Sequence, residues 1–324
     1  MNDIEKRGEG GFGCYRIPAV ICTAAGTLIV SYECRLTPDD WDTRAVGLRR
    51  STDNGKTWSE RVLPCRHDSL AVNNPVLCAM RDRGVLFLYQ LNYERTFVRR
   101  SFDDGLTFSP EKEITDAFED FRPAYDFNVC AVGPGHGIEL KNSRIVIPVW
   151  LASNPERHHS PSVTASLVSD DSGVTWQGGD VITASDMLPN PNETTAVQLE
   201  DGSVMFNIRH QGKTRRRAVA VSPDGKRDFT EPVFDGGLKD PQCFASLLAL
   251  PGKGLIAYSG CDSETARENL RIKFSLDSGT TWSPGIAVYD KAGYSDIAYS
   301  DGKIYCFFER DNLTALSVEV FANL

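Results

Sequence analysis

The segment STDNGKTW (residues 51–58) belongs to a pattern that recurs along this chain of 324 residues. SFDDGLTF, SDDSGVTW and SLDSGTTW begin at Ser101, Ser169 and Ser275, and a degenerate copy, SPDGKRDF, begins at Ser222. In such a segment Asp accepts hydrogen bonds from nearby backbone N–H groups, Gly supplies a positive φ, and Thr and the aromatic residue begin the next strand. The pattern predicts one kind of turn used repeatedly, which we call the Asp box.

Short strand-like runs separate the boxes, and each run is bounded by Gly, Asp or Asn. They lie at residues 26–33, 84–91, 143–150, 202–209, 254–260 and 303–310. Helix periodicity is scarce, and the modest helix candidate covers residues 262–268. About four strands in a period of roughly fifty residues are typical of one propeller blade. We therefore expect an all-β, six-bladed β-propeller of four-stranded antiparallel blades over residues 1–324, a single domain whose two terminal segments share a blade.

Composition narrows the possible partners and compartments. The net charge of −9 disfavours a nucleic-acid partner, because phosphate contacts need a basic surface. No apolar run approaches the length of a membrane span. The first ten residues lack the apolar core of a signal peptide, so we expect either a cytoplasmic chain or one whose leader was removed. The nine Cys residues are scattered without a CxxC pair, which favours buried free thiols and a reducing compartment.

An arginine interrupts an otherwise apolar strand in GCYRIPAVI (residues 13–21). Arginine stays charged and is almost never fully buried without a partner. Arg16 must therefore pair with a carboxylate of the protein or of a ligand. Side chains alternate along a strand, so we expect Tyr15 and Ile17 to face one way and Arg16 to face the mouth of the propeller.

The combination of Asp boxes with YRIP at residues 15–18 resembles the exo-α-sialidase (neuraminidase) family of bacteria and animals. The resemblance covers nearly the whole chain, as far as GYSDIAYS at residues 293–300. In that family three arginines from different blades hold the carboxylate of sialic acid, and the resemblance places them at Arg16, Arg209 and Arg271. Planar guanidinium groups suit this task because they bind a carboxylate bidentately.

The resemblance also implies a tyrosine nucleophile. A carboxylate nucleophile would be repelled by the carboxylate of the substrate, whereas a phenol is neutral and, with a pKa of about 10, needs a neighbouring base. The segment AGYSDIAYS places the nucleophile at Tyr294, with Glu193 as the base. Tyr299 in the same segment is the alternative nucleophile.

The resemblance further implies an aspartate as acid/base, on a loop after the first strand pair. The segment ECRLTPDDWD offers Asp39, Asp40 and Asp42. Counting along the chain from Arg35 and from the arginine pair at residues 49–50 favours Asp40, and the other two remain alternatives. The expected reaction is retaining hydrolysis of a terminal α-linked sialic acid.

Further substrate contacts are expected from Arg35, which resembles an additional arginine of the family, and from Asn73 and Asn74, which could face the N-acyl or O4 group. His158 and His159 have no partner at zinc spacing, so a loop lining the site is as good an explanation as a metal site. We expect no metal and no cofactor, and a sialylated glycan as the partner. A trans-sialidase, a hydrolase preferring the deaminated sugar Kdn, and a non-catalytic sialic-acid-binding propeller are the alternatives.

Overall fold

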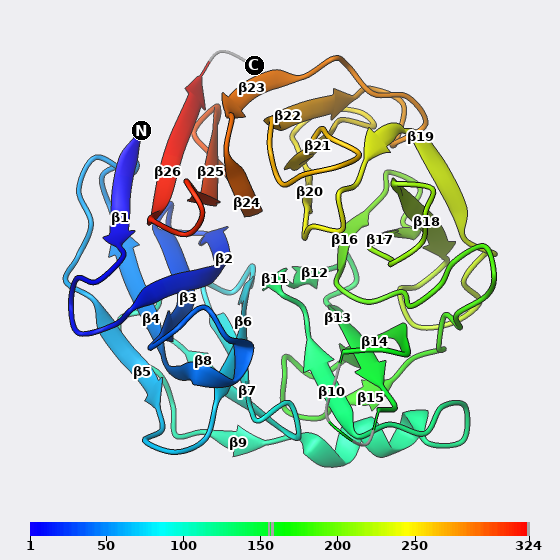
Figure 1. The fold of residues 1–324 in the computed structure, drawn as a ribbon, viewed down its shortest axis with the longest axis horizontal. Coiled ribbons are helices and arrows are strands. Elements are labelled where there is room, and N and C mark those ends of the chain that lie inside the picture. Colours follow the sequence, from blue (N-terminus) through cyan, green and yellow to red (C-terminus); the bar gives the residue numbers. More distant parts are fainter. Residues whose placement is uncertain (155, 157–158, 323–324) are drawn as a thin grey trace.

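The computed structural model describes residues 1–154, 156 and 159–322, in which six β-sheets surround a central axis as the blades of a propeller (Figure 1). The chain passes once around the ring, from the blue N-terminal sheet to the red C-terminal one. Within each blade the strands follow one another outwards from the axis, and in the second sheet the short β11 (Gly135–His136) adds to the inner edge. The six-bladed all-β fold is therefore confirmed.

Each blade is built from strands that are consecutive or nearly consecutive in the chain. Blade 1 contains β2 (Cys14–Cys22), β3 (Leu28–Arg35), β4 (Thr43–Ser51) and β5 (Val62–Arg66). Blade 2 contains β6 (Val72–Ala79), β7 (Val85–Leu91), β8 (Arg95–Ser101) and β9 (Lys112–Glu113). Blade 3 contains β10 (Val129–Val132), β13 (Ile145–Ala152), β14 (Ser162–Ser169) and β15 (Gln177–Gly178). Two short strands join these sheets: β11 (Gly135–His136) pairs parallel with β6, and β12 (Ile138–Glu139) pairs with β13.

The second half of the chain follows the same plan. Blade 4 contains β16 (Thr194–Gln198), β17 (Val204–Ile208), β18 (Arg216–Ser222) and β19 (Val233–Lys239). Blade 5 contains β20 (Ser246–Ala249), β21 (Ile256–Cys261), β22 (Leu270–Ser275) and β23 (Ile286–Tyr289). Blade 6 contains β24 (Ala292–Ser300), β25 (Lys303–Arg310), β26 (Ala315–Ala322) and, on its outer edge, β1 (Asn2–Lys6).

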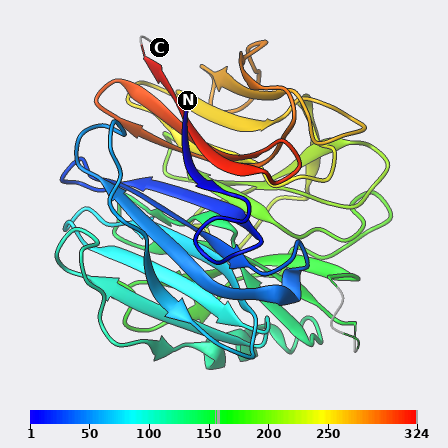
Figure 2. The same ribbon diagram turned by 60° about the vertical axis from the view of Figure 1, so that its left-hand side comes forward.

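The two ends of the chain close the ring. β1 pairs antiparallel with β26, so that Asn2 lies opposite Val318 and Lys6 opposite Ala315. Figure 2 shows the blue N-terminal strand alongside the red C-terminal strands. The expected sharing of one blade by the terminal segments is confirmed.

Helical structure in the described residues is limited to two 3-10 helices, η1 (Asp40–Asp42) and η2 (Thr115–Phe121). The predicted helix at residues 262–268 is wrong. Those residues form an irregular loop between β21 and β22, in which Ser263 Oγ accepts hydrogen bonds from the backbone N–H groups of Thr265 and Ala266. Within the described ranges, no helix is long and apolar enough to cross a membrane.

The Asp boxes form the predicted turns. In the first box, Asp53 Oδ1 accepts hydrogen bonds from Ser51 Oγ at 2.8 Å and from the Thr57 N–H at 2.9 Å. Asp53 Oδ2 accepts a further one from the Thr57 hydroxyl at 2.6 Å. Gly55 has a φ of 76°, and Asn54 before it also has a positive φ of 60°. The turn therefore contains two consecutive left-handed residues, whereas the sequence pattern pointed only to the glycine.

The same contacts recur in the boxes that follow β8, β14 and β22. The degenerate copy after β18 keeps part of them. Ser222 Oγ donates to Asp224 Oδ1 at 3.2 Å and accepts a hydrogen bond from the Gly225 N–H at 3.0 Å. The turn thus survives the loss of the Thr and of the regular spacing.

Apolar side chains fill the spaces between neighbouring blades. Ile29 of β3 and Phe87 of β7, for example, are fully buried in one cluster between blades 1 and 2. Burying each such side chain contributes about 1.5–3 kcal/mol. All nine Cys residues are free thiols and all except the half-buried Cys22 are buried, as expected for their side chains.

The two ends of the propeller axis carry different features. Arg16, Glu193 and Tyr294 lie at or just before the beginnings of the inner strands β2, β16 and β24. The Asp boxes lie at the opposite end, because they follow the third strand of blades 1 to 5. Consistent with this, a Cβ placed on Gly55 would lie 3.6 Å from Leu28 Cδ1, at the turn that follows β2.

Candidate active site

A hydrogen-bonded group of Tyr294, Glu193 and Arg209 lies at the centre of the site. Tyr294 Oη donates towards Glu193, with both carboxylate oxygens at 2.7 Å. Arg209 Nη1 donates to Tyr294 Oη at 2.8 Å and also to Glu193 Oε2. Tyr294 is 5% exposed and Glu193 is 7% exposed. The structure thus brings together three residues that the sequence had assigned to one site.

Glu193 and Arg209 meet Tyr294 because they occupy facing ends of neighbouring strands. Glu193 directly precedes β16 and Arg209 directly follows β17. Backbone pairing continues past both strands: the Asn192 N–H donates to the Arg209 carbonyl at 2.9 Å, and the Arg209 N–H donates to the Glu193 carbonyl at 3.2 Å. The separation of sixteen residues is therefore that of two residues paired across a β-hairpin.

The surroundings of Tyr294 keep its phenol protonated. Burial raises the pKa of Tyr294 above its ordinary value, and although Arg209 opposes this rise, the Glu193 carboxylate adds to it. A protonated phenol can attack only if a base removes its proton during the attack. Glu193 is in hydrogen-bond contact with that proton.

Tyr299, the alternative nucleophile, lies elsewhere. It is near the far end of β24 and lines a cavity of about 520 Å³ at the opposite end of the axis from Glu193. Val197 and Leu247, from the distal parts of their own inner strands, line the same cavity. Tyr299 therefore does not share the surroundings of the candidate base.

Arg16 is held by Glu309, which comes from β25 in blade 6. Arg16 Nε donates to Glu309 Oε1 at 3.0 Å, and Nη2 donates to Oε2 at 3.4 Å. The same carboxylate accepts hydrogen bonds from the backbone N–H groups of Ile17 at 3.1 Å and Tyr294 at 3.2 Å. Glu309 therefore fixes the arginine and the backbone of the tyrosine together. The sequence prediction missed it, although a carboxylate ending an apolar strand is a natural partner for a lone buried arginine.

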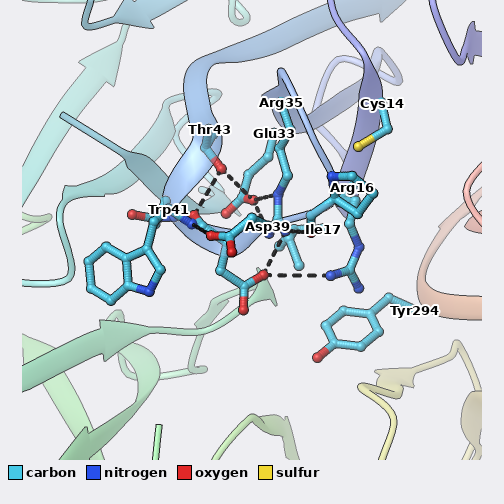
Figure 3. A network of polar contacts seen from close by, with 12 residues as sticks. Cys14, Arg16, Ile17, Glu33, Arg35, Asp39, Trp41, Thr43 and Tyr294 are labelled. Carbon is cyan, nitrogen blue, oxygen red and sulfur yellow. Dashed lines mark hydrogen bonds and ion pairs between the residues drawn. The ribbon is translucent and has the colours of Figure 1, made fainter. Parts of the chain in front are cut away.

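The strand around Arg16 is irregular. Ile17 has a φ of 57°, a left-handed value that β-branched residues rarely adopt, and the pairing of β2 with β3 shifts between Arg16 and Ala19. Tyr15 packs in the core between blades 1 and 6, whereas Ile17 packs against Tyr294. The expected alternation, with Tyr15 and Ile17 on one side, is therefore wrong. Figure 3 shows the Arg16 side chain beside the Tyr294 ring.

The third arginine beside Tyr294 is Arg267, and the structure does not bring Arg271 to the site. Arg267 Cζ lies 5.0 Å from the centroid of the Tyr294 ring, and Arg16 Cζ lies 5.1 Å from it. Arg271 is on β22, the third strand of blade 5, where its Nε donates to Asn269 Oδ1 at 3.1 Å. A third strand lies away from the axis, whereas the loop between β21 and β22 reaches the site. No sequence pattern had singled out Arg267.

Asp40 is the loop aspartate that contacts the arginines. Its Oδ1 accepts a hydrogen bond from Arg35 Nη1 at 2.6 Å and lies 3.6 Å from Arg16 Nη1. Burial tends to raise the pKa of Asp40, but the Arg35 and Arg16 guanidinium groups lower it more, so the net shift is downwards. Figure 3 shows Arg35 and Arg16 approaching the same part of this polar network.

The two neighbouring aspartates have other partners. Asp39 Oδ1 accepts a hydrogen bond from the Trp41 N–H at 2.7 Å and thereby caps η1. Asp42 Oδ1 pairs with Arg44 Nη2 at 3.1 Å. The geometry therefore distinguishes Asp40 from Asp39 and Asp42.

Three buried residues hold the segment around Asp40 in place through hydrogen bonds: Arg35, Asn73 and Asn74. Asn73 Nδ2 donates to the Asp40 carbonyl at 2.8 Å. The Asn74 N–H donates to Glu33 Oε1 at 2.7 Å, and Arg35 Nε donates to Glu33 Oε2 at 2.6 Å. These contacts position the loop and its aspartate. The expected contact of Asn73 and Asn74 with a ring substituent stays a prediction.

Aromatic rings border Asp40 on the side away from Tyr294, and Figure 3 shows Trp41 and Tyr294 on opposite sides of the network. His159 lies among these rings, 5.1 Å from Tyr93 and 4.9 Å from Trp150 between centroids. His159 Nδ1 is 3.8 Å from Asp40 Oδ2. His158 lies outside the described residues. In the part of the chain that the structure describes, no three His, Cys, Asp or Glu side chains are grouped as a metal site would require.

This arrangement can bind one carboxylate and react at the carbon next to it. Three guanidinium groups surround a phenol that already contacts a base, and a second carboxylate, Asp40, lies on the adjoining loop. Such a set supports nucleophilic substitution assisted by acid/base catalysis.

Sequence comparisons identify the relatives of this chain. Residues 60–306 match the family described as BNR repeat-like domain, and residues 49–60 match the BNR/Asp-box repeat. The chain is 29% identical over 315 residues to a sialidase from Micromonospora viridifaciens, and 27% identical over 319 residues to one from Bacteroides fragilis. These alignments cover 86% and 87% of this chain but 47% and 56% of the relatives, so the chain spans about half the length of these curated relatives.

Among solved structures, a Hadza microbial sialidase, Hz136, superimposes with a TM-score of 0.84 at 23% identity. That alignment covers 99% of this chain and 68% of the solved one, which shows a common fold. The match to the repeat-like domain extends over most of the chain, from after the first Asp box to residue 306, and the first box lies in the separate match at residues 49–60. The chain therefore belongs to the sialidase family of proteins with BNR/Asp-box repeats.

Proposed function

We infer that this protein is an exo-α-sialidase that hydrolyses terminal α-linked sialic acid with retention of configuration. The observation that carries the proposal is the contact of Tyr294 Oη with both Glu193 oxygens at 2.7 Å, inside a group of three arginines. A non-catalytic sialic-acid-binding propeller needs the arginines but has no use for a base buried against the tyrosine hydroxyl. This is the reason to prefer an enzyme over a lectin.

Substrate binding begins with the carboxylate on the anomeric carbon. Arg16, Arg209 and Arg267 would share it, each offering N–H donors to its oxygens. The three guanidinium groups repel one another, and Glu309 and Glu193 offset part of that repulsion through their contacts with Arg16 and Arg209. A bound carboxylate completes the neutralisation, so binding energy is concentrated beside the reacting carbon.

Glycoside cleavage then needs a proton for the leaving oxygen and a nucleophile for the anomeric carbon. Asp40 donates the proton, while Tyr294 Oη attacks and passes its own proton to Glu193. The C–O bond to the leaving group breaks as the bond to the tyrosine oxygen forms. Water, activated by the ionised Asp40, next attacks the anomeric carbon, and Tyr294 leaves and recovers its proton from Glu193.

Asp40 must be protonated for the first step, although Arg35 and Arg16 lower its pKa in the protein without substrate. Substrate binding offsets part of this effect, because the incoming carboxylate neutralises Arg16, whose Nη1 lies 3.6 Å from Asp40. The substrate therefore helps to protonate the acid that cleaves it.

Release of 4-methylumbelliferone from its α-sialoside tests the proposal, with Tyr294→Phe and Tyr299→Phe as a matched pair of variants. Turnover by the wild type and by Tyr299→Phe, with severe loss in Tyr294→Phe, supports it. Proton NMR should show the α-anomer of free sialic acid as the first product. Transfer to added lactose in place of release would indicate a trans-sialidase, and absence of turnover on sialic-acid and Kdn glycosides would favour the lectin.

A further inference from the structure

A cavity of about 300 Å³ opens beside the arginine group, between blades 1, 5 and 6. This volume lies at the lower end of the range for small-molecule pockets, about 300–1,000 Å³. Arg16 and Arg267 form one wall, while Lys291, Arg310 and Asn312 line the remainder. The cavity therefore shares two arginines with the predicted carboxylate site without including Tyr294 in its lining.

The charges around this cavity are mostly positive. Four cationic side chains line it, from Arg16, Arg267, Lys291 and Arg310, against the one carboxylate of Glu309. Both oxygens of Glu309 are engaged by Arg16, and they also accept hydrogen bonds from backbone N–H groups. No carboxylate is left over among the lining residues.

Two of these cations have no carboxylate of their own. Arg310 is neutralised by Asp3 and Asp311, at 2.8 and 2.5 Å. Within the described ranges, neither Arg267 nor Lys291 forms an ion pair with a carboxylate. Both are exposed, and Arg267 Nη2 donates to the Gln242 carbonyl at 3.2 Å. Because the proposed function assigns Arg267 to the carboxylate of the sialic acid, Lys291 is the cation of this wall that remains for a second negative charge.

The position of the cavity limits which part of a substrate can reach it. In a sialoside, the carboxylate and the glycosidic oxygen are attached to the same carbon. A cavity that shares Arg16 and Arg267 with the carboxylate site is therefore close to the leaving group. The N-acyl and glycerol substituents are attached to other ring carbons, several bonds away.

On the basis of the proposed sialidase function, we propose that this cavity is a subsite for a negatively charged leaving group. The preferred substrate would carry a carboxylate or sulfate on the group linked to the terminal sialic acid, and Lys291 would pair with it. Lys291 directly precedes β24 and lies three residues before Tyr294, so the same stretch of backbone places both residues. The subsite would select charged glycans over neutral ones.

Two aryl α-sialosides that differ in charge test this inference: one carries a 4-carboxyphenyl leaving group and the other a 4-carbamoylphenyl group. The measured quantity is kcat/KM for the carboxyphenyl sialoside divided by kcat/KM for the carbamoylphenyl sialoside. In Lys291→Gln this ratio should fall about two- to five-fold relative to the wild type, as expected for loss of one partly exposed ion pair. Comparing Lys291→Gln with the wild type cancels the intrinsic difference between the two leaving groups.

Lys253→Gln is the matched control, because Lys253 is an exposed lysine at the connection between β20 and β21, at the other end of the axis. It should keep the wild-type ratio. Added NaCl should lower the ratio in the wild type more than in Lys291→Gln. A 6-sulfogalactose derivative of α2,3-sialyllactose, compared with the unsulfated trisaccharide, distinguishes a sulfate from a carboxylate preference.

Turnover of both aryl sialosides with the same ratio in wild type and Lys291→Gln would overturn the subsite and leave the proposed function intact. Absence of turnover of these two glycosides and of the 4-methylumbelliferyl sialoside would overturn the proposed function, and the subsite with it.

Discussion

Tyr294 and Glu193, which are 101 residues apart in the chain, share one short contact in which the tyrosine hydroxyl lies 2.7 Å from both carboxylate oxygens. The contact joins blade 6 to blade 4 across the propeller axis. Burial raises the pKa of the Tyr294 hydroxyl, so the phenolate is costly unless its proton moves to Glu193 as the attack proceeds. In the proposed mechanism, the pair therefore acts as one unit.

Replacing Glu193 by Gln should lower kcat by about 10²- to 10⁴-fold, the range for loss of general-base catalysis. The amide keeps the shape of the side chain but cannot accept the phenolic proton as a base. The control is Gln198→Glu, which exchanges the same two residue types at the far end of β16, away from Tyr294. This variant should keep the kcat of the wild type. Steady-state kinetics with the 4-methylumbelliferyl sialoside measure the effect. A kcat within threefold of the wild type would contradict the assignment of Glu193 as the base.

Arg267 and Arg271 provide a sharp pair of variants, since they lie four residues apart and only one contacts Tyr294. Arg267→Ala should lower kcat/KM by about 10- to 10²-fold, because charge-assisted hydrogen bonds to the substrate carboxylate are lost. Arg271→Ala should change kcat/KM by less than about threefold, as expected for an ordinary surface arginine. Equal losses in the two variants, with both proteins folded by circular dichroism, would contradict the assignment.

The repeat and the short strands were sufficient to predict the number of blades, because each Asp box fixes a turn by local hydrogen bonds. Arg16, Glu193, Arg209 and Tyr294 were assigned through the resemblance to the sialidase family, whose motifs match this chain at these strand ends. Loop geometry was not predictable from local patterns. Arg267 lies on an irregular loop, and its approach to the tyrosine depends on how blade 5 is placed against blade 6. A strand position was therefore chosen in error at Arg271.

The choice among three neighbouring aspartates on one loop also depended on loop geometry that the sequence pattern does not show. Asp39, Asp40 and Asp42 are alike in sequence, and only the short η1 helix turns Asp40 towards Arg35. Glu309 was missed for a different reason: its importance lies in a contact with Arg16 across the closure of the ring, 293 residues away. The sequence does show a carboxylate at the end of an apolar strand, but it does not show that this strand lies beside Arg16.

Asp40→Asn should be rescued by a good leaving group. Its rate on a natural glycoside should fall by about 10²- to 10⁴-fold, whereas the loss on the 4-methylumbelliferyl sialoside should be much smaller, because an aryl oxygen needs less protonation. Asp39→Asn and Asp42→Asn are the matched controls and should keep the wild-type preference between the two substrates. The test compares kcat for α2,3-sialyllactose and the aryl glycoside in all four proteins. Leaving-group dependence in Asp39→Asn or Asp42→Asn would move the acid to that residue.

The pH dependence of Asp40 provides a related prediction. Arg35 and Arg16 lower its pKa in the free protein, and a bound carboxylate should raise it by neutralising Arg16. Because kcat reports the complex and kcat/KM the free protein, the alkaline limb of kcat should lie at higher pH than that of kcat/KM. Coincident limbs, or a limb of kcat at lower pH, would show that Asp40 is not the group being titrated.

The Asp boxes predict a loss of stability in acid. The Thr57 hydroxyl and N–H lower the pKa of Asp53 to about 2, and Asp103 and Asp277 are lowered to about 2 in the same way. A carboxyl whose pKa is depressed in the folded state stabilises the fold above its unfolded pKa, near 3.8, and that contribution is lost as the pH falls towards 2. The difference in urea midpoint between wild type and Asp53→Asn should therefore be constant above about pH 5 and should shrink between pH 4 and pH 2. Asp68→Asn, at an exposed aspartate on the loop after β5, is the matched control and should show no such convergence. A difference that stays constant down to pH 2 would mean that the ionised carboxylate does not stabilise the box, and that the turn is held by its backbone conformation.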